Sequence, residues 1–248
     1  MDRLGIIDWG IGGVSIYKLI KERSCSVPVT YFSDTGVTPY GKMPRYELAL
    51  RLDSVIRYLK ESGVTHVIIG CNSASTAIGD LSGNGIPVEG VIDPAVAMTA
   101  KLKPSKLGLI GGRRTVVSGV YRRAFAKHGI QLIQRIAQPL SGMIESGDVS
   151  SIELRTAACR ILSPLKDCSH ILLACTHYPA ITELLAAYVS SKTKFIDPAA
   201  ALVEQAAKWN LNGVGEDIFL TTGDAGAMKK AAFAAFHVSL TEVNNISL

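Results

Sequence analysis

The chain has 248 residues, of which 48% are hydrophobic and only 6% aromatic, so it can bury a large, mainly aliphatic core in one or two domains. Its 26 basic and 21 acidic residues leave a formal charge of +5 with no basic run of five, which does not indicate a nucleic-acid partner but suits a small anionic substrate. No uncharged apolar run reaches the ~18 residues of a membrane span, and an acid and a glycine interrupt the N-terminus where a signal peptide needs an apolar segment.

The apolar pattern predicts short buried strands that alternate with helices. The predicted strands are aliphatic runs at 4–8, 29–33, 65–70, 107–111 and 170–174. The predicted helices cover 12–23, 44–63 and 116–129. Pro44 suits the first turn of the second helix, and Gly63 suits its end. Strands and helices that alternate with short links predict parallel α/β sheets with helices on both faces.

The chain contains two copies of one unit of about 104 residues. The Leu-Gly pair of two predicted strands recurs at an offset of 103 residues, and Ile-Asp-Pro-Ala occurs at both 92–95 and 196–199. Cys71 and Cys175 are also 104 residues apart. Three landmarks at nearly one offset predict an α/β fold of two pseudo-symmetric lobes, because a solenoid would need shorter and more numerous repeats.

Each copy is expected to form one lobe with an active site in the cleft between them. We predict an N-terminal lobe of residues 1–95 plus 209–248 and a C-terminal lobe of residues 96–208. Parallel sheets bind ligands beyond the carboxyl ends of their strands, where Cys71 and Cys175 lie. The two lobes can therefore bring one thiol to each face of a bound molecule.

Two thiols on opposite faces of one carbon suit stereoinversion by general acid–base catalysis. One thiolate removes the proton from Cα, and the other thiol returns a proton to the opposite face. A free thiol with a pKa of roughly 8.5 is only about 3% ionised at pH 7. We expect the helix that follows Cys71 and Cys175 to favour the thiolate through its first-turn N–H groups.

The five cysteines are scattered through the chain and form no Cys-x-x-Cys pair. Because their number is odd, they predict free thiols in a reducing cytoplasm. Cys25, Cys159 and Cys168 have no motif around them and are interpreted as inert core residues. His66 and His170 precede the two equivalent strands and are also interpreted as structural.

Seven short motifs follow one another along nearly the whole chain. They lie at 5–13, 34–41, 70–75, 110–121, 139–147, 174–179 and 221–224. Together they resemble the aspartate/glutamate racemase family, with Pro-Tyr-Gly at 39–41 and Cys-Thr-His-Tyr-Pro at 175–179 among the most specific. The resemblance implies a two-lobed α/β fold, no cofactor and a homodimer. It also implies racemisation of an acidic amino acid, glutamate first and aspartate second, with D-glutamate serving peptidoglycan.

The resemblance implies a role for each matching residue. Cys71 and Cys175 correspond to the acid/base cysteines, the first acting on the D-isomer and the second on the L-isomer. Asp8 and His177 correspond to the groups that assist them. The residues that match substrate-binding positions are Pro39, Tyr40, Gly41, Asn72, Ser73, Thr115, Thr176 and Glu145.

The sequence departs from the family pattern at the predicted site. Trp9 stands where the family has a small serine that meets substrate, so it is a predicted substrate contact that narrows the cavity. Arg114 replaces an alanine and can add positive charge, while Gly112 replaces a threonine. Ser73 replaces a threonine but keeps the hydroxyl group.

Three other interpretations remain open for the same residues. Asp8, Cys71, Cys175 and His177 could bind zinc, although their spacing lacks clustered ligands. The two cysteines could form a redox disulfide, or the chain could sense amino acids without catalysis. The glycine-rich segment 10–13 is a weak nucleotide motif, and we expect its N–H groups to face a carboxylate beside the substrate.

Overall fold

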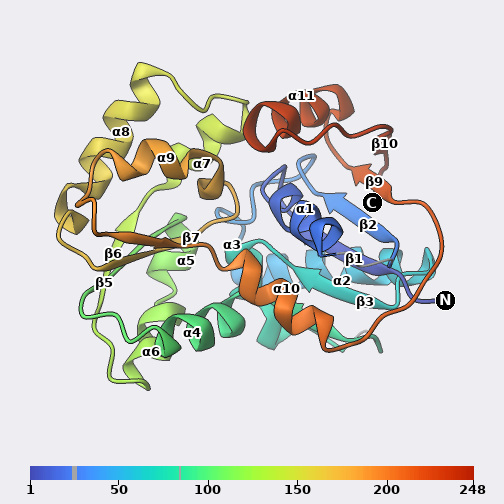
Figure 1. The fold of residues 1–248 in the computed structure, drawn as a ribbon. Coiled ribbons are helices and arrows are strands. Elements are labelled where there is room, and N and C mark those ends of the chain that lie inside the picture. The colour runs from blue at the N-terminus through green and yellow to red at the C-terminus, as the bar shows by residue number, and fades with distance from the viewer. Residues whose placement is uncertain (24–26, 84) are drawn as a thin grey trace.

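The computed structural model describes residues 1–23, 27–83 and 85–248, and its strands in these ranges form two parallel sheets (Figure 1). The first sheet has the order β10-β9-β2-β1-β3-β4 and contains β1 (Leu4–Asp8), β2 (Val29–Ser33), β3 (His66–Ile69), β4 (Val88–Gly90), β9 (Ile218–Thr221) and β10 (Asn244–Asn245). The second has the order β6-β5-β7-β8 and contains β5 (Leu107–Gly111), β6 (Leu132–Ile136), β7 (His170–Ala174) and β8 (Lys194–Ile196).

The two sheets repeat one topology, as the sequence offset predicts. The order β2-β1-β3-β4 of the first copy corresponds to β6-β5-β7-β8 of the second. The register is preserved as well, because Leu4 pairs with His66 as Leu107 pairs with His170. The predicted α/β fold of two pseudo-symmetric parallel lobes is therefore confirmed.

Helices flank both sheets. Those of the first copy are α1 (Val14–Glu22), α2 (Arg45–Glu61), α3 (Asn72–Ser75), the 3-10 turn η1 (Ile78–Asp80) and α4 (Ile92–Lys101). Those of the second are α5 (Arg113–Val117), α6 (Val120–Ala126), α7 (Gln138–Glu145), α8 (Ile152–Leu162), η2 (Ser163–Leu165), η3 (Tyr178–Ile181), α9 (Thr182–Ala186) and α10 (Ala199–Ala207). The C-terminal segment adds α11 (Ala225–Phe236).

The helix predictions hold for the first two segments and fail in part for the third. Helix α2 begins directly after Pro44 and buries one apolar face, which includes Leu52 and Leu59. The predicted helix 116–129 is interrupted at Gly119, whose φ of 67° is left-handed. Glycine adopts this conformation without steric cost, so the chain turns there between α5 and α6.

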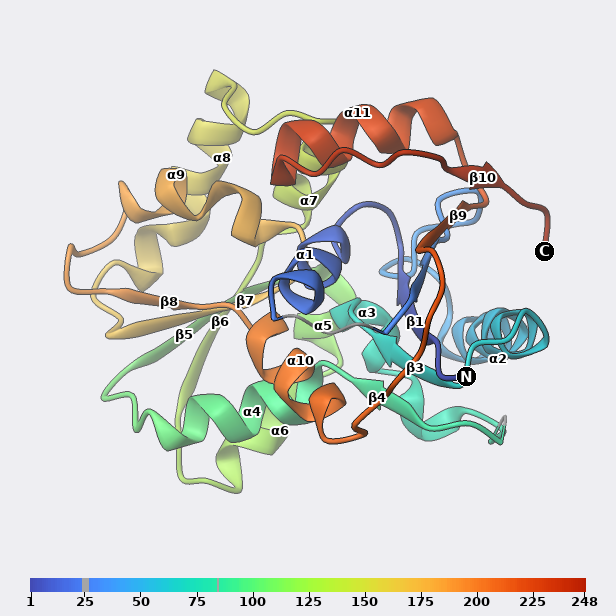
Figure 2. The same cartoon turned by 45° about the vertical axis from the view of Figure 1, so that its right-hand side comes forward.

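The lobes contact one another through two helices, each of which follows one sheet in the chain but packs against elements of the other copy. Helix α10 follows the second sheet but packs on α1, α4 and β4, while α11 packs on α7 and η3 (Figures 1 and 2). The predicted boundary at 95/96 falls within α4, and both lobe boundaries stay predictions. Among the described residues, no helix is long and apolar enough to cross a membrane.

Candidate active site

A cavity of about 440 Å³ lies where the carboxyl ends of the two sheets meet. Its wall draws on both lobes. The lining residues are Asp8, Trp9, Pro39, Tyr40, Gly41, Lys42, Cys71, Asn72, Ser73, Gly112, Gln138, Pro139, Ser141, Gly142, Ala174, Cys175, Thr176 and His177. This volume suits a small-molecule ligand. One cysteine from each copy therefore lines the same cavity.

Cys71 lies between the end of β3 and the single turn of α3, and its side chain is partly buried. Burial raises the pKa of this thiol and the charge of Asp8 raises it further, whereas the N–H groups of Ala74 and Ser73 lower it. The N–H groups at the helix start do favour the Cys71 thiolate, as expected, but burial and Asp8 outweigh them and the net pKa is raised. One short turn does not offset burial beside a carboxylate.

Asp8 ends β1 and is 1% exposed. Neither carboxylate oxygen accepts a hydrogen bond of standard geometry from a described residue. Burial raises the pKa of Asp8 to about 7, and the charge of His177 and the neighbouring Thr176 hydroxyl oppose the rise only in part. Asp8 can therefore gain or lose a proton near neutral pH.

His177 joins Cys175 to Glu145. Its Nδ1 lies 3.6 Å from the Cys175 sulfur, and its Nε2 lies 2.6 Å from Oε2 of Glu145. Burial lowers the pKa of His177, but the hydrogen bonds and charges of Cys175 and Glu145 outweigh it and raise the pKa well above its usual value. At neutral pH the imidazolium donates to both neighbours.

The glycine-rich segment 10–13 binds the carboxylate of Glu145, the residue that contacts His177. The backbone N–H of Ile11 donates to Oε2 of Glu145 at 2.9 Å. Gly10 has a φ of 98°, and a Cβ there would overlap the Glu145 carboxylate. The segment therefore requires glycine for a close approach. The sequence predicted that N–H groups of segment 10–13 face a carboxylate. In the structure this carboxylate is the side chain of Glu145, which accepts from the Ile11 N–H.

A loop of residues 37–41, here called the substrate loop, forms one wall of the cavity. The Tyr40 hydroxyl donates to Asp34 at 2.7 Å, and Arg51 binds both oxygens of that carboxylate. The indole N–H of Trp9 donates to the Val37 carbonyl at 3.2 Å. Trp9 thus lines the cavity while it supports the loop.

Two predicted polar residues have buried groups without a partner among the described residues. Asn72 is 2% exposed; its Oδ1 accepts from Tyr121 at 2.7 Å, but Nδ2 has no acceptor. Thr115 is 1% exposed and its hydroxyl is also unpaired. Buried polar groups without a partner are rare in folded proteins, and each needs a specific explanation. Asn72 lines the cavity, whereas Thr115 and Glu145 are not among its lining residues.

Sequence reasoning missed several lining residues. Lys42 follows the Pro-Tyr-Gly motif and brings a primary ammonium to the wall. Gln138 and Ser141 come from α7, and Gln138 Nε2 donates to the Ser141 hydroxyl at 3.1 Å. The position of Lys42 beside a motif was a usable signal. The motif at 139–147 and the predicted role of Glu145 pointed to α7, but did not single out Gln138 or Ser141.

Cys159 and Cys168 are not among the residues that line this cavity. Cys168 is buried in the core, as predicted, whereas Cys159 is exposed on α8 and is not a core residue. Cys25 lies outside the described residues. Cys71 and Cys175 are free thiols. Among the described residues, no group of three or more His, Cys, Asp and Glu side chains could hold a metal ion.

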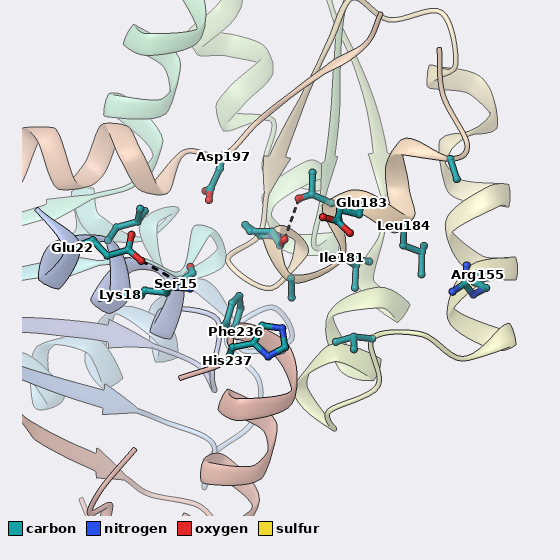
Figure 3. Close-up of a pocket in the computed structure, with 17 residues that line it drawn as sticks. Ser15, Lys18, Glu22, Arg155, Ile181, Glu183, Leu184, Asp197, Phe236 and His237 are labelled. Atoms are coloured by element: carbon teal, nitrogen blue, oxygen red, sulfur yellow. Dashed lines mark hydrogen bonds and ion pairs between the residues drawn. The ribbon is translucent and has the colours of Figure 1, made fainter. Parts of the chain in front are cut away.

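A larger hollow of about 860 Å³ is lined by residues of α1, η3, α9 and the end of α11, among others (Figure 3). Residues 179–181 of η3 form part of its wall, directly after the segment that lines the candidate site. Lys18 and Glu22 of α1 form an ion pair at 4.0 Å at one end of it, and Arg155 lies at the other end. It contains neither Cys71 nor Cys175, so it is not the site of the chemistry described above.

Comparison with known proteins decides the family. The model of the Asp/Glu/hydantoin racemase family matches residues 4–206. The chain belongs to this family. A glutamate racemase from Synechococcus sp. (strain CC9605) is 34% identical over 82% of this chain and 77% of its own length. A glutamate racemase from Carboxydothermus hydrogenoformans is 30% identical over 99% of this chain and 96% of its own.

Solved structures of this racemase family share the fold along the whole chain. Glutamate racemase from Francisella tularensis in complex with D-glutamate has a TM-score of 0.88 at 25% identity and covers 99% of this chain and 97% of its own. The enzyme from Thermus thermophilus in complex with β-chloro-D-alanine has a TM-score of 0.87 at 27% identity, covering 100% and 97%. The resemblance found in the sequence is confirmed.

Proposed function

We propose that the chain is a cofactor-independent glutamate racemase that uses Cys71 and Cys175 as its two acid/base groups. The observation that carries the proposal is the position of these cysteines at equivalent strand ends of a duplicated fold, lining one cavity. Family membership and the relatives named as glutamate racemases support the substrate. Lys42 and His177 supply positive charge to the cavity, which suits a substrate with two carboxylates.

The proton positions suit reaction from the L-isomer. In this direction Cys175 acts as the base, and His177, which contacts both Cys175 and Glu145, lies beside its sulfur and stabilises negative charge there. Cys175 removes the proton from Cα and forms an S–H bond. Cys71 starts as the thiol, because its pKa is raised, and transfers its proton to the opposite face of Cα. The D-isomer reacts in the reverse sense, and Asp8 can accept the Cys71 proton, since its pKa is about 7.

The predicted polar residues have distinct parts in this proposal. Asn72, Ser73 and Thr176 line the cavity and bind the amino and carboxylate groups of the substrate. The substrate loop and Trp9 enclose the side chain. Glu145 and Thr115 are not among the lining residues, and Glu145 orients His177 rather than touching substrate.

The direct test follows the circular dichroism of L- and D-glutamate, and of L- and D-aspartate, with purified protein. We expect both glutamate enantiomers to lose their signal as they converge on the racemate, with aspartate slower. Preference for aspartate would make this chain an aspartate racemase of the same family. No change with either amino acid would contradict the proposal.

The protein is also proposed to act as a cytoplasmic homodimer that supplies D-glutamate for peptidoglycan. The scattered, odd set of cysteines supports a reducing compartment. Light scattering of the purified protein tests the dimer. Dialysis against a chelator separates the racemase from the zinc alternative: the two-thiol chemistry keeps its activity, whereas a zinc enzyme loses it.

A further inference from the structure

Arg114 connects the two lobes at the rim of the candidate site. It lies on α5, which follows the second sheet, and its Nε donates to the Tyr40 carbonyl of the first lobe at 2.9 Å. The guanidinium is partly buried, and it is not among the residues that line the cavity. Its bond is therefore made to the backbone of the substrate loop.

The other anchors of the substrate loop lie on its own lobe. The Tyr40 side chain is 1% exposed and its hydroxyl donates to Asp34, which also pairs with Arg51. Trp9 holds the Val37 carbonyl. These contacts hold Val37 and the Tyr40 side chain to the N-terminal lobe. Only a group from the opposite lobe can hold the loop closed across the cleft.

We propose that Arg114 is a positioning residue that latches the substrate loop of residues 37–41 across the cleft by binding the Tyr40 carbonyl. The inference rests on the proposed racemase function for its kinetic consequence, but the latch itself is a property of the fold. A charge-assisted hydrogen bond from arginine is stronger than a neutral one, and its planar fork holds one geometry. Arg114 acts on the loop and does not touch the substrate.

The charges around Arg114 agree with this role. Arg45 at the start of α2 is a like charge that acts on Arg114, and Arg45 itself is paired with Asp80. Arg114 forms no ion pair with a carboxylate of the described residues, and its Nε–H donates to the loop carbonyl of Tyr40. Replacing Arg114 by alanine removes a donor without leaving a buried carboxylate unpaired.

Trp9 reports on the latch without any substrate. The chain has two tryptophans, so Trp209→Phe leaves Trp9 as the single emitter and keeps a ring against His66. In this background Arg114→Ala should shift the Trp9 emission to longer wavelength, because an open loop exposes the indole. Arg114→Lys keeps a donor and should restore part of the shift. The matched control is Arg113→Ala, which removes an exposed arginine from the same turn and should leave the emission unchanged.

Steady-state kinetics with L- and D-glutamate complete the test. Arg114→Ala should raise KM about tenfold for both enantiomers with little change in kcat, since the lost bond holds the loop and takes no part in proton transfer. A raised KM with unchanged Trp9 emission would mean that Arg114 binds substrate directly, and the latch would be rejected. Unchanged emission and unchanged KM would reject it as well. If the protein racemises neither amino acid, the proposed function fails while the emission still decides the latch.

Discussion

The two sides of the candidate site carry the same thiol but different partners. On one side Cys175 contacts His177, which is held by Glu145 in a continuous hydrogen-bonded chain. On the other side Cys71 lies near Asp8, whose carboxylate accepts no standard hydrogen bond from the described residues. A duplicated fold has thus kept its two cysteines equivalent while the groups that serve them have diverged.

The repeat shows how the difference arose. His177 lies two residues after Cys175, and the equivalent position after Cys71 is Ser73. Asp8 ends β1, and the equivalent end of β5 is Gly111. Each copy therefore carries one ionisable helper where the other has a small residue. Each thiol therefore has one ionisable group beside it, Asp8 for Cys71 and His177 for Cys175. Proton transfer is assisted on both faces of Cα and not on one face alone.

The largest expected effect comes from removing either thiol. Cys71→Ser or Cys175→Ser should lower racemisation by ~10²–10⁴-fold, because a hydroxyl is too weak an acid to replace a thiol. Cys71→Ser should still exchange the α-proton of L-glutamate with D₂O without inversion, and Cys175→Ser should do so for D-glutamate. NMR measures the exchange. Near-wild-type racemisation in either variant would remove the two-base mechanism, and far-UV circular dichroism checks the fold.

Asp8→Asn tests the less connected side. We expect a loss of ~10²-fold in kcat, since Cys71 loses the group that accepts its proton. The equilibrium constant of racemisation is one, so kcat/KM must fall equally in both directions. The side is instead identified by the isotope effect of α-deuterated substrate, which should increase for D-glutamate. A larger increase for L-glutamate would mean that Asp8 assists Cys175 and not Cys71.

Asp8→Asn should also stabilise the folded protein, and more so at high pH than at low pH. Asp8 has a pKa of about 7 in the folded protein, against 3.8 for an unperturbed aspartate. The protonated form is favoured by folding, so its stabilisation is complete below pH 4 and is lost as pH rises through 7. Asp8→Asn should therefore raise the free energy of unfolding by roughly 1–4 kcal/mol at pH 8 and less at pH 5. Urea denaturation at the two pH values measures the free energy of unfolding. A gain in stability found only at pH 5 would contradict the prediction.

Glu145→Gln tests the better-connected side and should cost ~10-fold in kcat. The amide keeps much of the shape but removes the charge that, with Cys175, raises the pKa of His177. That pKa should fall, and the alkaline limb of the kcat/KM profile should move to lower pH. The isotope effect should now increase for α-deuterated L-glutamate. An unchanged pH profile would show that Glu145 only packs against His177.

The sequence predicted the symmetric parts of this site better than the asymmetric ones. The offset between Cys71 and Cys175 placed both thiols at strand ends, because repeats preserve topology. The contact between Glu145 and His177 crosses 32 residues and depends on how α7 packs, which no local pattern encodes. The Arg114 bond crosses 74 residues and both lobes. Gly119 is a residue type that often ends helices, but the prediction followed the apolar periodicity and continued one helix across it.

Trp9→Ser should have the smallest effect and tests whether the Cys71 side also sets substrate size. Trp9 follows Asp8 and lines the cavity, so its indole occupies space beside that thiol. Removing the ring should raise the ratio of glutamate to aspartate efficiency about tenfold, since one methylene in an apolar pocket is worth ~1–3 kcal/mol. Trp9→Phe is the matched control, because it keeps an aromatic ring but loses the N–H that binds the Val37 carbonyl. If both variants change the ratio equally, the hydrogen bond to the substrate loop sets specificity. An unchanged ratio in folded Trp9→Ser would show that the two sides of the site differ in proton transfer but not in their control of side-chain length.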